Sequence, residues 1–318
     1  MTEPDDARTR QPRIGIDLGG TKISGILLAA DATVASQFRV DTPRGNYEGT
    51  ITAIVELVNG LSEKEQGQPS VGIGIPGSLS PSSGRVQNAN STWLNGRPFK
   101  QDIENALSLP VRLANDANCF ALSEAVDGSG AGAQSVFGVI LGTGCGGGLV
   151  VDGQLIDGPR GIGGEWGHNP LPSPNTEELP GNKCWCGRNG CLETWVSGPG
   201  MAQDHERICG ETLTAEEIAH RANEGNRDAE KTLARHASRL ARGLAGVINI
   251  FDPERVVLGG GLSAMPHLYD TLPELVTPHI FSDNALIDIR SPVHGPDSGV
   301  RGAAWLWGGP DSKDDAMK

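Results

Sequence analysis

Aromatic residues make up only 4% of this 318-residue chain, and no apolar run approaches the ~20 residues that span a membrane. The first twelve residues, MTEPDDARTRQP, lack the apolar centre of a signal peptide. We therefore expect a cytoplasmic protein without a membrane partner. The length is sufficient for two ordinary domains with sizeable cores.

Basic residues are also scarce, because 26 Lys and Arg stand against 39 Asp and Glu and give a formal net charge of −13. Broad nucleic-acid binding needs a basic surface, so the sequence predicts no nucleic-acid partner. An anionic small molecule is not excluded, since backbone N–H groups and a bound cation can hold phosphates despite an acidic exterior.

Cysteine is rare as well, yet three of the six cysteines fall in KCWCGRNGCLE, residues 183–193. Disulfides are uncommon in the cytosol, so the cluster indicates metal ligands or reactive thiols. Cys184, Cys186 and Cys191 have C-x-C-x4-C spacing, and glycines at 187 and 190 permit a tight turn. Free thiols and a redox pair remain alternatives to a metal site.

Glycine is abundant instead, with 45 residues that gather beside apolar runs. Residues 14–28, IGIDLGGTKISGILL, align without a gap with residues 137–151, FGVILGTGCGGGLVV. The identical pairs are Gly15 and Gly138, Leu18 and Leu141, Gly19 and Gly142, and Gly25 and Gly148. Each segment predicts a strand, a tight turn and a second strand, and the match suggests two halves with one architecture.

Other segments predict a mixed α/β chain in two lobes. Strands are expected at 71–76, 111–116 and from 255, and helices at 98–107, 118–126 and 229–251. The last helix should stop near Asp252-Pro253, because proline disfavours continuation.

Three glycine-rich turns follow strands: DLGGTK (17–22), LGTGCGGG (141–148) and LGGGLS (258–263). None fits the P-loop pattern, and no dinucleotide fingerprint is convincing, because a strand follows the second turn where a helix would be needed. Two such turns on duplicated hairpins, with Asp17 beside the first, suit a nucleotide clamped between lobes.

Taken together, DLGGTK, NDAN, LGTGCGGG, GEWGH, CWCGRNGCLE and VVLGGGLS resemble the ROK family of sugar kinases. The resemblance implies a duplicated actin-like (ribonuclease-H-like) α/β fold, with nucleotide and sugar in the cleft between two lobes. It places the smaller lobe at 1–118, with a closing helix within 299–318 packed back on it. The larger lobe is expected at 119–298, and a homodimer is implied.

Several segments, NANSTWLNG (88–96) above all, look most like bacterial fructokinases of the manno(fructo)kinase type. This resemblance implies ATP-dependent phosphorylation of D-fructose to fructose 6-phosphate, with mannose as a possible second substrate. A glucokinase or N-acetylhexosamine kinase is the alternative within the family. A non-catalytic sugar-sensing regulator is the alternative of another class, disfavoured because only about thirteen residues precede the first expected strand.

The resemblance assigns ATP and Mg²⁺ to the three turns. Asp17 is expected to organise Mg²⁺ through water, because phosphoryl transfer depends on positioning and charge neutralisation. The residues expected to contact the nucleotide are Gly19, Gly20, Thr21, Lys22, Gly142, Thr143, Gly144, Gly146, Gly147, Gly148, Gly259, Gly260 and Gly261.

Asp116 in NDAN is the predicted catalytic base, which accepts the proton of the sugar hydroxyl as it attacks the γ-phosphorus. Asn115 or Asp116 could also cap the helix that follows. The resemblance gives the sugar ligands as Gly77, Asn90, Asn115, Asp116, Glu165, His168 and Glu193.

The family's matching histidine, His168, completes a Cys₃His set with Cys184, Cys186 and Cys191, which is the ligand set of a closed structural Zn²⁺ site. Such a site should hold Glu165 and Glu193 in place. We expect sugar affinity to depend on this metal more than nucleotide affinity, since the nucleotide turns lie far along the chain.

Overall fold

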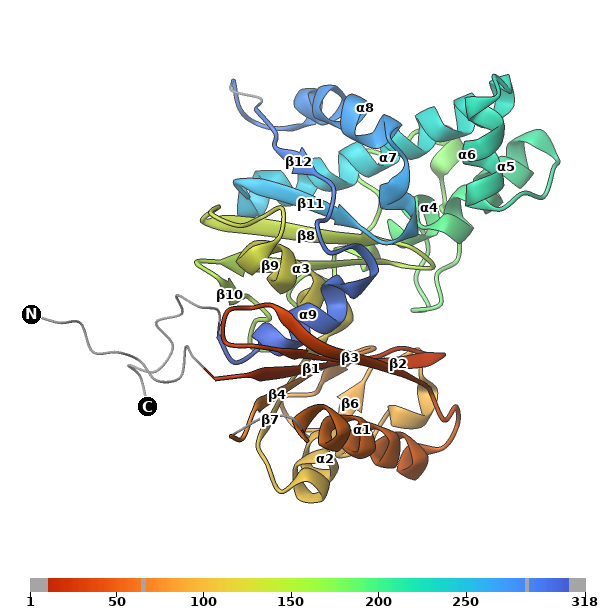
Figure 1. Ribbon diagram of the computed structural model, residues 1–318. Coiled ribbons are helices and arrows are strands. Elements are labelled where there is room, and N and C mark those ends of the chain that lie inside the picture. The colour runs from red at the N-terminus through yellow and green to blue at the C-terminus, as the bar shows by residue number, and fades with distance from the viewer. Residues whose placement is uncertain (1–10, 64–66, 284–285, 309–318) are drawn as a thin grey trace, which may run out of the picture.

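Two five-stranded sheets organise the part of the chain that the computed structural model describes, residues 11–63, 67–283 and 286–308 (Figure 1). The first sheet has the order β3 (Val34–Asp41), β2 (Lys22–Leu28), β1 (Arg13–Leu18), β4 (Ser70–Ile75) and β7 (Val111–Asn115). The second has the order β10 (Gln154–Leu155), β9 (Cys145–Val151), β8 (Ser135–Leu141), β11 (Arg255–Gly259) and β12 (Ile289–Arg290).

The two sheets repeat one plan. In each, an antiparallel hairpin (β1–β2 or β8–β9) is followed on the side of its first strand by two parallel strands. The hairpins coincide with the two aligned segments 14–28 and 137–151. The predicted duplication is therefore confirmed.

Two helices, α3 (Asp116–Asp127) and α9 (Ser298–Trp305), form a layer between the sheets (Figure 1). They pack closely because glycines stand at the contacts. A Cβ at Gly72 of β4 would lie 1.9 Å from the Ala303 oxygen, and one at Gly302 would lie 1.6 Å from the Cys119 oxygen. The expected closing helix thus contacts the first sheet and α3 together, while residues 309–318 of that prediction lie outside the described residues. The predicted lobe boundary at 118 falls within α3 and stays a prediction.

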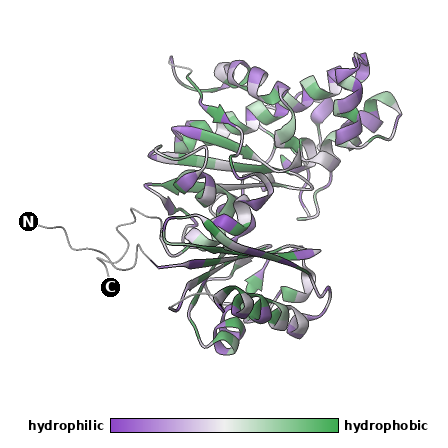
Figure 2. Ribbon diagram, viewed as in Figure 1, coloured by the Kyte–Doolittle hydropathy of each residue, from purple (hydrophilic) through white to green (hydrophobic). Residues whose placement is uncertain are grey.

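Further helices cover the outer faces. The first sheet carries α1 (Tyr47–Ser62) and α2 (Phe99–Leu107), and the second carries α5 (Gly198–Cys209), α6 (Ala215–Asn223), α7 (Arg227–Phe251) and α8 (His267–Val276) (Figure 1). Shorter elements are β5 (Ser78–Leu79), β6 (Val86–Gln87), α4 (Glu193–Val196), and 3-10 turns at Thr92–Leu94, Trp166–His168, Thr176–Glu178, Gly261–Ala264, Thr277–His279 and Gly295–Asp297. Hydrophobic residues run along both sheets (Figure 2).

The long helix α7 begins and ends close to the predicted bounds of 229–251. The side chain of Asn226 caps its start by accepting from the N–H groups of Asp228 and Ala229. It ends where Asp252 takes a left-handed conformation before Pro253. In the described ranges, no helix combines the length and apolarity needed to cross a bilayer.

Candidate functional site

Two carboxylates meet at one edge of the first sheet. Asp17 lies near the carboxyl end of β1, and Asp116 directly follows the carboxyl end of β7. Between them runs β4, whose Gly74 is in register with Asp17 on one side and Ala114 on the other. A Cβ at Gly74 would lie 3.6 Å from Asp17 Oδ1, so the missing side chain leaves room for the carboxylate.

The electrostatics of this pair favour protonation. Burial, and then the like charge of Asp116, raise the pKa of Asp17 from 3.8 to about 6. Burial also raises the pKa of Asp116, opposed by hydrogen bonds from backbone N–H groups and Asn115. Although protein atoms surround its carboxylate, the Asp116 residue as a whole remains exposed to solvent, so a small molecule can reach it.

Because its pKa is raised in the folded state, an ionised Asp17 weakens folding as pH rises from about 4 through 6. At ~1.4 kcal/mol per pKa unit, the penalty at pH 7 is about 2–3 kcal/mol. Asp17→Asn should therefore increase the free energy of unfolding at pH 7, without nucleotide or Mg²⁺, while activity is lost.

Urea unfolding at pH 7 and pH 4.5 measures this effect. The gain should shrink at pH 4.5, where the wild-type carboxylate is largely protonated. The exposed Asp270→Asn serves as the control and should change stability by under about 0.5 kcal/mol. If Asp17→Asn and wild type had equal free energies of unfolding at both pH values, the ionised Asp17 carboxylate would not destabilise the fold.

The structure shows which residue of NDAN caps α3. Asn115 is the N-cap of α3, and its Oδ1 accepts from the Ala117 N–H at 2.9 Å. Its Nδ2 donates to the Gly77 oxygen at 3.2 Å. Asp116 is the first residue of the helix, and its Oδ1 also accepts from Ala117 N–H, at 2.8 Å. Asn115 thus supplies the cap and ties the start of α3 to Gly77.

The first glycine turn, between β1 and β2, is supported by residues that the sequence did not single out. Thr42 donates its hydroxyl to the Gly19 oxygen at 2.8 Å, and Arg44 donates Nε to the Gly20 oxygen at 2.8 Å. Gly20, Thr21 and Lys22 remain exposed. Arg44 therefore adds a second positive charge to the turn that carries Lys22, and its place in DTPRG after β3 was the available signal.

The second and third turns share a cavity of about 500 Å³. Its lining consists of Gly142, Thr143, Gly198, Pro199, Ala202, Thr214, Ala215, Glu216, Gly261 and Leu262. The N–H of Gly198, at the start of α5, donates to the Gly142 oxygen at 2.8 Å. The sequence missed the α5 and α6 residues, although Ser197 and Thr214 are recognisable helix caps.

Other predicted nucleotide glycines do not line this cavity. Gly146, Gly147 and Gly148 lie in β9, where a Cβ at Gly147 would meet Phe137 and Trp166. Gly259 is buried against Phe120. The remaining two, Gly144 and Gly260, lie against Glu193 and the Leu141 backbone respectively. These glycines allow close packing of the turns.

The predicted sugar ligands converge only in part. Burial raises the pKa of Glu165, nearby His168 lowers it, and the charges of Asp116 and Glu193 raise it again, so these four residues interact electrostatically. By contrast Asn90 is exposed and makes no hydrogen bond to the rest of the described chain. The structure does not connect Asn90 to the other four.

The four predicted metal ligands come together. His168, Cys184, Cys186 and Cys191 place their ligand atoms within 4.8 Å of one another. Cys184 Sγ lies 3.6 Å from His168 Nδ1, and Cys186 Sγ lies 3.6 Å from Cys191 Sγ. Zn–S and Zn–N bonds of about 2.3 and 2.0 Å give tetrahedron edges of about 3.5–3.8 Å, so the donor set fits a four-coordinate ion.

The surrounding backbone shapes this cluster. Gly187 and Gly190 take φ values of +90° and +73°, which permit the turn between the cysteines. Hydrogen bonds from the backbone and then the side chain of Arg188 lower the pKa of Cys186 to about 6. Cys186 is therefore a ready thiolate ligand at neutral pH.

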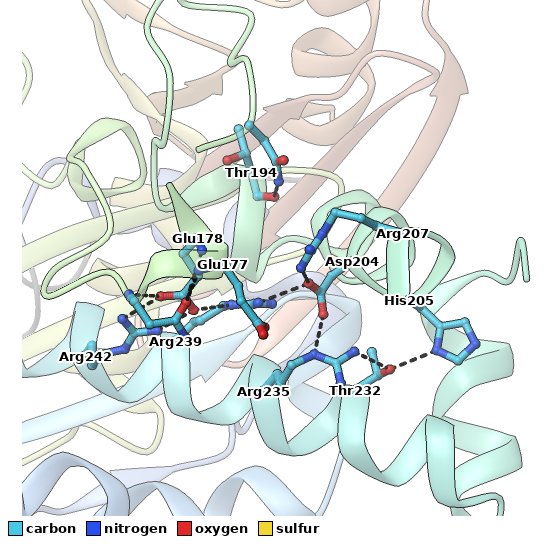
Figure 3. Close-up of polar contacts among 12 residues, drawn as sticks. Glu177, Glu178, Thr194, Asp204, His205, Arg207, Thr232, Arg235, Arg239 and Arg242 are labelled. Atoms are coloured by element: carbon cyan, nitrogen blue, oxygen red, sulfur yellow. Dashed lines mark hydrogen bonds and ion pairs between the residues drawn. The ribbon is translucent and has the colours of Figure 1, made fainter. Parts of the chain in front are cut away.

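A buried ionic cluster is formed by Glu178, Asp204, Arg239 and Arg242 and edged by Arg207 and Arg235 (Figure 3). Arg239 joins Glu178 (2.8 Å) to Asp204 (3.0 Å). The pKa values of both acids fall to about 2; burial opposes this shift, but hydrogen bonds from the arginines outweigh it. The cluster therefore fastens the loop before Cys184 and the helix α5 onto α7.

The sequence pattern of the ROK family matches residues 13–309. The chain belongs to the ROK family. A ROK hexokinase from Thermus thermophilus has a similar solved structure, with a TM-score of 0.83, 31% identity, and coverage of 93% of this chain and 97% of its own. A ROK-family glucokinase from Streptomyces griseus gives a TM-score of 0.74, 29% identity, and coverage of 93% and 98%. The predicted actin-like fold is confirmed.

Several relatives phosphorylate, by their names, a sugar other than the predicted fructose. An N-acetyl-D-glucosamine kinase from Pectobacterium atrosepticum is 40% identical over 296 residues, which cover 92% of this chain and 97% of the relative. Another from Pasteurella multocida is 38% identical over 300 residues, covering 93% and 99%. This ROK-family chain is a sugar kinase, as predicted, but the assignment as a fructokinase is wrong.

The structure explains why the fructokinase resemblance misled. It rested mainly on NANSTWLNG, whose side chains hold their own loop. Asn95 bonds both the N–H and the oxygen of Ala89, at 2.9 Å each, and Trp93 donates to Thr50 at 3.3 Å. Leu94 is fully buried. These contacts stabilise the loop and hold it against α1, which is a structural role that does not depend on the sugar.

Proposed function

We propose that this protein transfers the γ-phosphoryl group of ATP to a hydroxyl of N-acetyl-D-glucosamine. The observation that carries the proposal is the match, over more than nine-tenths of both chains, to several N-acetyl-D-glucosamine kinases. The paired carboxylates Asp17 and Asp116 support it, because one can serve a metal ion and the other a reacting hydroxyl.

In this proposal Asp116 is the general base. Burial holds its pKa above the ordinary value, which makes its carboxylate a better proton acceptor than a solvated aspartate. Asn115 fixes its orientation through the cap and through Gly77. Asp17 would hold Mg²⁺ through water, and the ion would neutralise charge on the phosphates.

The nucleotide fits the cavity between the second turn and the start of α5. Apolar side chains, Pro199, Ala202, Ala215 and Leu262, suit the face of a purine base. The backbone N–H groups of Thr143 and Gly144 would meet phosphates, next to the exposed side chain of Thr143, while the Gly142 N–H is held within the turn by the Gly144 oxygen. The first turn, with Lys22 and Arg44, would meet the phosphates from the other sheet.

We also propose a structural Zn²⁺ held by His168, Cys184, Cys186 and Cys191. Four protein ligands leave no open position, so the ion would orient its neighbours and activate no water. Those neighbours include Glu165 and Glu193, two proposed sugar ligands.

A coupled ADP-release assay with N-acetylglucosamine, glucose, mannose, fructose and glucosamine tests the substrate. N-acetylglucosamine should give the highest kcat/KM, by at least about 10-fold over glucosamine, which lacks only the acetyl group. A higher value for fructose or glucose would overturn the sugar assignment and leave the kinase intact.

A further inference from the structure

Trp185 occupies an unusual position, between two proposed metal ligands and in contact with a third. Its side chain is 69% exposed, although it is a tryptophan. The indole packs edge to face on His168, with ring centroids 5.0 Å apart. Its Nε1–H donates to Glu193 Oε1 at 2.8 Å. The indole orientation is therefore tied to the metal loop at one end and to Glu193 at the other.

The second oxygen of Glu193 reaches the phosphate turn. Glu193 Oε2 accepts from the backbone N–H of Cys145 at 3.0 Å. The contact is tight, because a Cβ at the preceding Gly144 would lie only 2.8 Å from the same oxygen. Glu193 thus spans the gap between Trp185 and the turn at 142–145.

The short helix α4, which carries Glu193, is held in place by contacts with α7. The guanidinium carbon of Arg239, a member of the ionic cluster, lies 4.5 Å from the ring centre of Trp195. A buried His236 lies 2.9 Å from the Val196 oxygen. Because these contacts hold α4 in place, we expect a conformational change in the loop 183–191 to move the Glu193 side chain and not the helix itself.

We propose that Trp185 is a positioning residue that couples the metal loop to the phosphate turn. The indole N–H orients the Glu193 carboxylate, and the carboxylate in turn fixes the Cys145 N–H and the conformation of Gly142–Gly144. Nucleotide affinity then depends on occupancy of the metal site. The sequence predicted that loss of the metal would affect sugar affinity more than nucleotide affinity, and the proposal reverses this. Trp185 and Cys145 are 40 positions apart in the sequence, but two hydrogen bonds through Glu193 connect them.

Trp185→Phe tests the coupling, because it removes the N–H and keeps an aromatic ring beside His168. Trp307→Phe is the matched control, since Trp307 donates its indole N–H at 2.7 Å to the Val71 oxygen, which is no part of the site. Titration calorimetry with MgADP should show at least about a 5-fold weaker Kd for Trp185→Phe and no change for the control. Zinc content, measured by elemental analysis, should stay that of the wild type.

The kinetic counterpart is a rise in KM for ATP that exceeds any rise in KM for the sugar. Removing the metal from wild type with a chelator, with folding checked by circular dichroism, should weaken MgADP to a similar extent. Removing the metal from Trp185→Phe should weaken MgADP binding little further. The inference is wrong if zinc-loaded Trp185→Phe binds MgADP as wild type does, or if only the sugar KM rises. The inference rests on the proposed zinc and nucleotide sites. If the wild-type protein binds neither zinc nor MgADP, those proposed sites are wrong, and the coupling through Trp185 is not what failed.

Discussion

Asp116→Asn is expected to lower kcat by about 10²–10⁴-fold, the range lost when a general base is removed. The amide is nearly isosteric and its oxygen can still accept from the Ala117 N–H, as Asp116 Oδ1 does at 2.8 Å. What it cannot do is take the proton of the attacking hydroxyl. Steady-state ADP release at saturating sugar and ATP measures the loss.

The fold of this variant should be intact, because Asn115 rather than Asp116 caps α3. At neutral pH its Tm should be equal to or above that of the wild type, because the amide removes a charge that burial disfavours and that also repels Asp17. Asp270→Asn should retain full activity. A kcat within a few-fold of wild type would reduce Asp116 to a binding residue and leave the reaction without its base.

The fold was predictable where a pattern repeats locally. The hairpins 14–28 and 137–151 carry glycines and alternating apolar residues that allow only a strand, a turn and a strand. Their alignment alone predicted that two sheets share one plan. The position of α9 between the sheets was not predictable in this way, because it depends on glycines such as Gly72 and Gly302 that meet far apart in the sequence.

The clustering of Cys184, Cys186 and Cys191 was predictable because cysteine is rare and its spacing is restrictive. The contact between Glu193 and Cys145 was not, since a side chain reaching a backbone N–H 48 positions away leaves no local pattern. Burial of His205 and His236 was hidden for a similar reason. His205 lies in the polar stretch QDHER of α5, and His236 lies among the apolar residues of α7, and helix packing encloses both. Burial lowers the pKa of His236 to about 4, so it remains neutral.

The sugar was the hardest property to predict. Identity of the hexose depends on how a few carboxylates and amides meet individual hydroxyls, and similar loops can serve different sugars. In NANSTWLNG, the segment that most suggested a fructokinase, Trp93 and Asn95 form hydrogen bonds that stabilise the loop. Glu165 and Glu193 lie far apart in the sequence, and only the folded chain shows that their charges interact.

Cys184→Ser should abolish the proposed metal site, with zinc falling from about one ion per chain to a small fraction. Cys184 is buried and lies 3.6 Å from His168 Nδ1, so a serine hydroxyl there is a poor replacement ligand. We expect the Tm to fall by about 5–10 °C, because metal binding contributes to local folding. Elemental analysis and differential scanning calorimetry measure the two effects.

The fall should be limited because the loop has a second anchor. Glu178, 4% exposed, stays paired with Arg239 and Arg242 after the metal is lost. Cys209→Ser is the control, since Cys209 lies on α5 outside the cluster and should keep both the zinc and the Tm. If the wild-type protein carries no zinc, or if Cys184→Ser and Cys209→Ser behave alike, the cysteines at 184, 186 and 191 are ordinary thiols.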